Sequence, residues 1–246
     1  KKMGIKASAT CVMNFDGATG YLIGPANKGL NCMFTFMNTA RLGTAMQGLA
    51  HGELSFQGSL DYACDRLAMR SLTGPKNPDG PADPIIVHAD VRRMLLAQKA
   101  YAEGAYALCL LGSQLADDEK TAPTEEERQH AHTLLDFLTP IIKSWPSEYG
   151  PRANSLAIQV LAGHGYINEH PVEMFYRDNR LNPIHEGTYC IQSLDLLARK
   201  VPMNGLAGYQ AMLNEFETTI GEAKQQDALA EFANDLADAT RTLASV

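Results

Sequence analysis

Residues 42–67, with the sequence LGTAMQGLAHGELSFQGSLDYACDRL, indicate the class of this fold. The apolar residues of the stretch recur at intervals of three and four, which is the spacing of one face of an α-helix. The residues of that face are Leu42, Ala45, Met46, Leu49, Leu60, Ala63, Cys64 and Leu67. The pattern predicts one long helix that ends near Arg70.

Helical spacing continues on the C-terminal side of this stretch. Residues 74–84 are rich in proline and glycine and predict a loop, after which a second long helix follows. Thr124 and Glu127 have the spacing of a capping box and predict the start of a third helix. Because proline lacks an amide hydrogen, Pro146 is expected to interrupt that helix, with another running from about Ala153 to Leu161.

Shorter helices are expected towards the C-terminus. Pro171 suits a first helical turn and predicts a short helix from Val172 to Asp178. A last interior helix is expected to begin at Thr188. After Pro202 the pattern is that of acidic, amphipathic helix.

Residues 1–24 are the only part of the chain with a β pattern. Two short runs, 10–15 and 18–24, flank Asp16-Gly17, and this dipeptide between β-rich runs is a strong hairpin signal. A lone hairpin is marginal in water, so we expect this one to belong to a larger sheet outside the chain. The expected fold class is therefore mainly α, a helical bundle that carries a short N-terminal β-hairpin.

The composition excludes several classes of protein. The 246 residues are 45% hydrophobic, and no apolar run approaches the ~20 residues of a membrane helix. A net charge of −7 argues against nucleic acid or an anionic membrane as the main partner. The five cysteines are far apart, so we expect no disulfide framework, no metal site and a reducing cytoplasm as the location. Neither end has the features of a natural terminus, and we expect the chain to be part of a longer protein.

Three local clusters are candidates for chemistry. The glycines of Ala162–Tyr166 could admit a phosphate close to the backbone, or could simply end a helix. Tyr176–Arg180 could be functional or could form structural ion pairs. In Pro183–Thr188, Glu186 could be a general base beside free backbone N–H groups, or could favour the dipole of a helix that Thr188 caps.

Together and in this order, the clusters resemble the acyl-CoA dehydrogenase family. The resemblance rests on Gln159–Tyr166, His170–Glu173, Tyr176–Asp178 and Ile184–Gln192, and it covers residues 1 to about 201. It implies that residues 1–24 are the end of the middle β domain and that 25–201 are the C-terminal helical bundle, which contacts flavin and acyl-CoA. Residues 202–246 then resemble the start of the helical extension that a branch of longer members carries.

The resemblance implies a base and two substrate contacts. Glu186 would remove the α-proton of an acyl-CoA thioester while a hydride leaves the β-carbon, giving the trans-2-enoyl-CoA. Gly187 would let the acyl chain pass, and Arg41, on a first helix about one turn longer than in short-chain members, would be a further substrate contact. Some relatives carry their base near the position of Thr39 and Ala40, where this chain has no acid, which favours Glu186.

The cofactor that the resemblance implies is FAD. The residues implied to contact it are Arg70, Ser71, Leu72, His88, Gln159, Gly163, Thr188, Tyr189 and Cys190. The sets at 70–72 and 159–163 would reach FAD bound mainly by a neighbouring subunit, which implies a homodimer or a dimer of dimers. An electron-transfer flavoprotein would take up the electrons. Ala162 and Ala89 depart from a usual glycine and a common glutamine of the family.

Two further expectations follow from the resemblance. The chain holds only the last hairpin of the β domain and none of the N-terminal helical domain, so we expect the chain alone to bind no FAD and to be inactive. The alternative is a non-catalytic or DNA-damage-response flavoprotein relative, or a helical oligomerisation module. A basic patch and loss of the base would favour that alternative, whereas this chain has a charge of −7 and retains Glu186.

Overall fold

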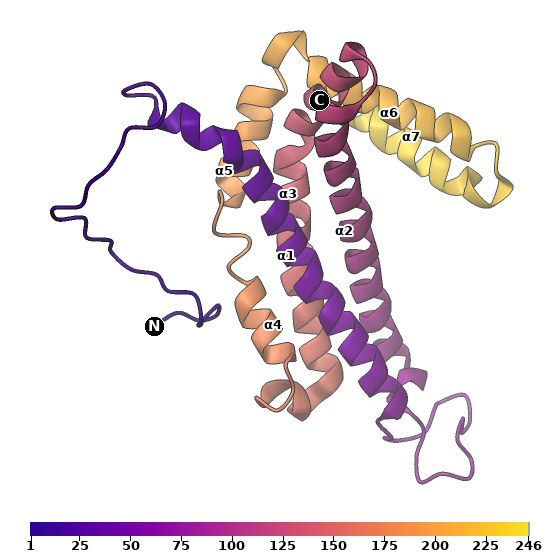
Figure 1. The fold of residues 1–246 in the computed structure, drawn as a ribbon. Coiled ribbons are helices and arrows are strands. Elements are labelled where there is room, and N and C mark those ends of the chain that lie inside the picture. The colour runs from indigo at the N-terminus through magenta and orange to yellow at the C-terminus, as the bar shows by residue number, and fades with distance from the viewer. Residues whose placement is uncertain (246) are drawn as a thin grey trace. The chain divides into compact units, whose positions relative to one another are not determined.

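The computed structural model describes residues 1–245 and is built from helices (Figure 1). The long helices are α1 (Gly29–Asp65), α2 (Ala89–Thr121) and α3 (Glu125–Leu161). The shorter ones are α4 (Val172–Asn179), α5 (Tyr189–Leu194), α6 (Ala207–Ala223) and α7 (Ala230–Ala244). Five single turns, η1 to η5, are Ile85–Val87, Ala162–Tyr166, Asp195–Lys200, Met203–Gly205 and Asp227–Leu229. The chain divides into two compact units.

The first unit, residues 1–111 and 141–190, holds α1, α4 and parts of α2 and α3. The backbones of α1 and α3 approach closely, since a Cβ on Gly48 would lie 2.7 Å from the carbonyl oxygen of Pro146. On α2, Gly104 similarly faces the ring of Trp145. One end of these helices encloses a hydrophobic cluster of Ala63, Met94, Leu95, Ala157, Val160, Leu161 and Val172. This packing fixes the positions of the helices that carry the candidate site.

The second unit, residues 112–140 and those from Ile191 on, contains the helical pair α6 and α7. Gly208 lies against the ring of Phe137, and Lys200, almost fully buried, forms an ion pair of 3.0 Å with Asp136. The helices expected after Pro202 are therefore present.

Several predicted helix boundaries are confirmed. The capping box forms as expected, with the Glu127 amide donating to Thr124 Oγ1 at 3.2 Å and the Thr124 amide donating to Glu127 Oε2 at 3.0 Å. The α4 helix begins directly after Pro171, and α5 begins directly after Thr188.

The predicted break at Pro146 is wrong. The α3 helix runs without interruption from Glu125 to Leu161 through Pro140, Pro146 and Pro151. Pro140 and Pro146 are fully buried, and Pro146 contacts the backbone of α1 at Gly48. Tertiary packing against α1 therefore offsets the hydrogen bond that Pro146 cannot make.

The predicted end of the first helix near Arg70 is also wrong, because α1 ends at Asp65 and Arg66 has an extended backbone. Arg70 accordingly lies in the loop between α1 and η1 rather than on the helix.

The predicted β-hairpin is not observed in residues 1–24. The turn at its centre is present, since the Ala18 amide donates to the carbonyl of Phe15 at 3.0 Å and Gly17 has a φ of 71°. The flanking runs form no strands, and Val12 and Ile23 are 98% and 89% exposed. The local turn signal is satisfied, but no sheet is available to bury the flanking side chains.

Candidate active site

Glu186 lies on a strained turn between α4 and α5. Its φ is 56°, in the left-handed region that side-chain-bearing residues avoid, and Gly187 follows with a φ of 96°. Glu186 is half-buried. A non-glycine residue in this conformation persists only where its surroundings hold it, and such strain concentrates at functional sites. The contacts that hold this turn therefore matter to its function.

A buried lysine on α3 forms hydrogen bonds to the backbone around this turn. Lys143 has no exposed surface, and its Nζ donates hydrogen bonds to the carbonyls of Asn182 at 2.8 Å and Gly187 at 2.7 Å. These two carbonyls lie on either side of Glu186 in the chain. The Lys143 ammonium thus fixes the backbone both before and directly after the carboxylate.

Three buried asparagines anchor the start of the same loop. Asn182 Nδ2 donates to Asn179 Oδ1 at 2.8 Å, and Asn179 Nδ2 donates to Asn154 Oδ1 at 2.7 Å. Asn154 Nδ2 in turn donates to the hydroxyl of Ser55 on α1 at 2.6 Å. A buried network of this kind fixes one arrangement of its members, because breaking it would leave polar groups without partners. The network connects α1, α3 and α4 to the loop that carries Glu186.

The charges around Glu186 are mostly positive. Arg41 of α1 is 6% exposed and interacts electrostatically with Lys143, as does Glu186. Burial of Lys143 and the nearby Arg41 charge lower the pKa of Lys143 to about 8, although Glu186 opposes them. The tertiary structure therefore brings two of the predicted site residues, Glu186 and Arg41, to one place, together with Lys143.

His185 completes this group. Its Nε2 lies 3.2 Å from the hydroxyl of Thr44 on α1. Burial, together with the positive charge of Lys143, lowers the pKa of His185, while Glu186 opposes the shift. His185 is therefore neutral near pH 7, and it adds no further positive charge beside Glu186.

Thr188, Tyr189 and Cys190 follow Glu186 and Gly187 directly and are exposed. Burial raises the pKa of the Tyr189 phenol, as does its hydrogen bond to Glu148. That side chain lines a shallow polar hollow with Arg152 and Arg180. Of these three predicted flavin contacts, Tyr189 thus has its hydroxyl engaged by Glu148, while Thr188 and Cys190 expose their side chains.

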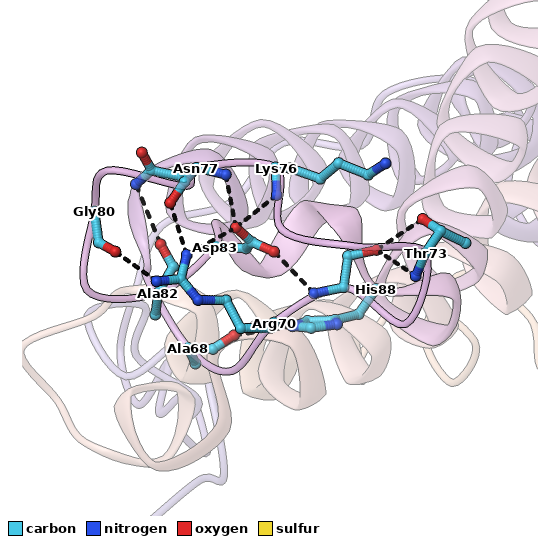
Figure 2. Close-up of polar contacts among 10 residues, drawn as sticks. Ala68, Arg70, Thr73, Lys76, Asn77, Gly80, Ala82, Asp83 and His88 are labelled. Carbon is cyan, nitrogen blue, oxygen red and sulfur yellow. Dashed lines mark hydrogen bonds and ion pairs between the residues drawn. The ribbon is translucent and has the colours of Figure 1, made fainter.

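The predicted contacts at residues 70–72 lie on a loop built around one buried carboxylate, that of Asp83 (Figure 2). Its oxygens accept the backbone amides of Ser71 at 2.8 Å, Lys76 at 2.9 Å and Asn77 at 2.7 Å. Burial raises the pKa of Asp83, but these hydrogen bonds and that of Arg70 outweigh burial and lower it to about 2. Asp83 therefore sets the conformation of the whole loop.

Arg70 is engaged within the same loop. Its Nη1 donates to the carbonyl of Asn77 and its Nη2 donates to the carbonyl of Gly80, each at 2.6 Å (Figure 2). Leu72 is fully exposed, and His88 Nε2 donates to the carbonyl of Ala68 at 2.9 Å. The guanidinium of Arg70 thus stabilises the loop, and the exposed side chain that the loop presents is Leu72.

The glycine-containing turn after α3 is arranged differently from either expectation. The left-handed residue is Ala162, with a φ of 51°, and not a glycine. Gly163 is exposed and has open space where a side chain would stand, whereas a Cβ on Gly165 would lie 2.5 Å from the carbonyl oxygen of Ile158. Gln159 is also exposed. Gly165 therefore serves packing, while Gly163 leaves the backbone open to an approaching group.

The predicted residues thus form two separate groups within the first unit. At 1.5 Å per residue, Gln159 lies about 24 Å along α3 from Lys143. The group around Glu186 and the group at 159–163 cannot contact the same small chemical group.

Among residues 1–245, no cluster of three or more His, Cys, Asp or Glu side chains could hold a metal ion.

The ion pairs of Tyr176–Arg180 support its structural interpretation. Arg177 pairs with Glu173, with a contact of 2.6 Å, and donates to the carbonyl of Met3 at 3.0 Å. The Asp178 carboxylate accepts the amide of Ile5 at 2.6 Å. These contacts attach residues 3–5 to α4.

Residues 27–201 match the family model described as the acyl-CoA dehydrogenase C-terminal domain. The chain belongs to the acyl-CoA dehydrogenase family.

Relatives support this membership. The chain is 40% identical to 3-methylmercaptopropionyl-CoA dehydrogenase of Ruegeria pomeroyi, over 99% of this chain and 41% of that protein. It is 34% identical to a butyryl-CoA dehydrogenase of Syntrophomonas wolfei, over 94% of this chain and 39% of that protein. The chain therefore spans about two fifths of the length of these relatives.

The fold of this chain is similar to that of solved structures. The Caenorhabditis elegans protein ACDH-11, solved in complex with C11-CoA, matches with a TM-score of 0.79 at 19% identity, over 91% of this chain and 35% of that chain. Butyryl-CoA dehydrogenase of Megasphaera elsdenii matches with a TM-score of 0.57 at 21% identity, over 70% of this chain and 39% of that chain. In residues 1–245, no helix is both long and apolar enough to cross a membrane.

Sequence reasoning missed Lys143, Asp83 and the three asparagines. Lys143 carried a weak signal, because it follows Ile141 and Ile142 in an apolar stretch where a charged side chain must find buried partners. Asp83 carried none, since an aspartate in a proline-rich loop is ordinary.

Proposed function

We propose that this chain supplies the base and the helical wall of the active site of an FAD-dependent acyl-CoA dehydrogenase. The reaction is the α,β-dehydrogenation of an acyl-CoA thioester to the trans-2-enoyl-CoA. The observation that carries the proposal is the position of Glu186, half-buried on a strained turn that Lys143 holds by two hydrogen bonds, inside the region that matches the family.

Glu186 acts as the general base and takes the proton from the α-carbon of the thioester. Its carboxylate lies on a turn that Lys143 holds in place, so little reorganisation is needed when the substrate binds. The backbone N–H of Glu186 donates to the thioester carbonyl, where negative charge develops as the proton leaves. Gly187, without a side chain, leaves room for the acyl chain. Arg41 adds a second positive charge close to this point.

FAD would supply the acceptor for the hydride that leaves the β-carbon. Thr188 and Cys190 expose their side chains next to the Glu186 turn and are suited to contact the flavin end. Gln159, about 24 Å along α3 from Lys143, is exposed, as is Gly163, which leaves the backbone open. The loop of Ser71 and Leu72 offers a further exposed edge, although the Ser71 amide is already bonded to Asp83.

Two separate groups of cofactor contacts favour an assembly in which neighbouring subunits share their FAD sites. We therefore propose a homodimer or a dimer of dimers. The surface of α1 and α2 supports association, because exposed apolar side chains gather there: Leu54 at 49%, Leu96 at 65%, Tyr106 at 57% and Leu110 at 53%. An electron-transfer flavoprotein would reoxidise the enzyme, and the cytoplasm is its proposed location.

The decisive experiment uses the protein as its gene encodes it. A bound-flavin absorbance band that bleaches on addition of an acyl-CoA thioester is the expected result. Butyryl-CoA and 3-methylmercaptopropionyl-CoA, the thioesters named for two relatives, are suitable first probes. A bound flavin that no thioester of a wide panel reduces would favour the non-catalytic or DNA-damage-response alternative instead.

A further inference from the structure

We propose that Lys143 is the positioning residue of this active site, because its buried ammonium holds the Glu186–Gly187 turn in the conformation from which Glu186 reacts. This inference rests on the proposed role of Glu186 as the base. It adds a residue that acts through the turn rather than on the substrate.

The first observation is the geometry of the hydrogen bonds. Lys143 Nζ lies 2.7 Å from the Gly187 carbonyl oxygen and 2.8 Å from that of Asn182. A lysine ammonium has three donors, and two of them bind the backbone on either side of Glu186. Because Lys143 is on α3, a helix of 37 residues, both carbonyls are bonded to a long helix outside the loop.

The second observation is the strain of the turn. Glu186 has a φ of 56°, and Gly187 has a φ of 96°. The left-handed region is unfavourable for a residue with a side chain because the Cβ crowds the following carbonyl oxygen, so the loop alone would not favour this conformation. The charge-assisted hydrogen bonds of Lys143 are the strongest contacts to this turn among those described, and they compensate for that strain.

The third observation is the cost of burying Lys143. A fully buried ammonium is expensive and is retained where it has partners that require its charge. The partners here are two backbone carbonyls and, electrostatically, the carboxylate of Glu186. Replacing Lys143 by an apolar residue would remove the ammonium that donates to both carbonyls, so the turn would relax away from its strained conformation.

The charged and titratable groups that face this ammonium come from α1 and from the loop before α5. They are Arg41 on α1, with His185 and Glu186 on the loop. The pKa of Lys143 is about 8, so its positive charge is lost as the pH rises through that value. The pKa of His185 is lowered by burial and by the charge of Lys143, so the loss of the Lys143 proton is separated from the titration of His185.

The test uses the gene-encoded protein with FAD bound and measures the rate of flavin reduction by saturating butyryl-CoA or 3-methylmercaptopropionyl-CoA. For Lys143→Met we expect a rate reduced by about 10- to 100-fold with the thioester dissociation constant changed less than about threefold. In the wild type we expect the rate to fall above pH 8 as Lys143 loses its proton, and in Lys143→Met this alkaline limb should be absent. Lys143→Gln, which keeps a donor but not the charge, should fold more readily and should also lack the limb.

Lys200→Met is the matched control. Lys200 is likewise buried, with 1% exposure, and pairs with Asp136 of the second unit rather than with the Glu186 turn. This variant should lose thermal stability but keep the reduction rate and the alkaline limb. Equal losses of rate in Lys143→Met and Lys200→Met would reduce Lys143 to a stabilising residue and overturn the proposal, as would an unchanged alkaline limb in Lys143→Gln.

Failure of the proposed function would give a different result for Glu186→Gln than failure of the Lys143 proposal. If Glu186→Gln retained the wild-type reduction rate, the base itself would be wrongly assigned, whatever Lys143 does. If Glu186→Gln lost the rate while Lys143→Met kept both the rate and the limb, the base would stand and the positioning role of Lys143 would be refuted.

Discussion

The carbonyl oxygen of Gly187 accepts a hydrogen bond of 2.7 Å from the Lys143 ammonium, although the two residues are 44 positions apart in the chain. This contact joins the middle of α3 to the turn that carries Glu186. The candidate site therefore depends on the tertiary fold, which brings these two distant parts of the chain together.

Glu186→Gln should keep FAD and thioester binding and lose most of the turnover. Glutamine has nearly the same shape as glutamate but cannot accept the α-proton, and loss of a general base costs on the order of 10²-fold or more. Flavin reduction in the gene-encoded protein, followed by absorbance in a rapid-mixing experiment, measures the effect. Near-normal reduction in this variant would remove Glu186 from its proposed role.

Asp83→Asn should loosen the loop of residues 70–83. The pKa of Asp83 is about 2 in the folded chain and 3.8 in the unfolded reference, so its stabilising effect is present above about pH 4 and is lost as the pH falls towards 2. The protection factors for amide hydrogen exchange at Ser71, Lys76 and Asn77 should therefore decrease in wild type on acidification. In Asp83→Asn they should be low at every pH, and strong protection at pH 7 in that variant would contradict the assignment.

Gly48→Ala and Gly58→Ala, both on α1, should have opposite effects. A Cβ at position 48 would lie 2.7 Å from the backbone carbonyl oxygen of Pro146, so we expect a loss of about 2–3 kcal/mol in the free energy of unfolding. Position 58 has nothing within 4 Å, and the higher helix propensity of alanine should add about 0.5–1 kcal/mol. Chemical denaturation of the chain provides both values, and a tolerated Gly48→Ala would refute the close approach of α1 and α3.

Ala162→Gly should stabilise the chain. Ala162 has a φ of 51°, and glycine would relieve a strain of roughly 1–2 kcal/mol while adding about 0.4–1 kcal/mol of entropy to the unfolded state. The net gain expected is about 0.5–1 kcal/mol, measurable as an increase in the denaturation midpoint. An unchanged or lower midpoint in Ala162→Gly would contradict the strained conformation of Ala162.

The 246-residue chain alone should associate but carry no flavin. Light scattering at tens of micromolar should give at least a dimer, and Leu96→Glu, which places a charge on the exposed apolar surface of α2, should weaken it. Leu243→Glu, on α7, is the matched control. A stoichiometric flavin band in the purified chain would mean that this domain holds more of the cofactor site than we propose.

The sequence by itself determined the features that depend on near neighbours. The capping box of Thr124 and Glu127, the start of α4 after Pro171 and the turn at Asp16-Gly17 all form, because each requires only residues within four positions. The ordered motifs from Gln159 to Gln192 were also sufficient to indicate the family, which the comparisons confirm.

Only the tertiary structure decided the rest. The continuity of α3 through Pro146 depends on packing against Gly48, and the missing strands of residues 1–24 depend on a sheet that is not there to pair with. In the sequence, Lys143 is one charged residue of a helix. In the structure, two carbonyls of a loop 39 to 44 residues further along the chain accept hydrogen bonds from its buried ammonium. Burial and long-range hydrogen bonds are properties of the folded arrangement, so no local pattern could assign this lysine to the site of Glu186.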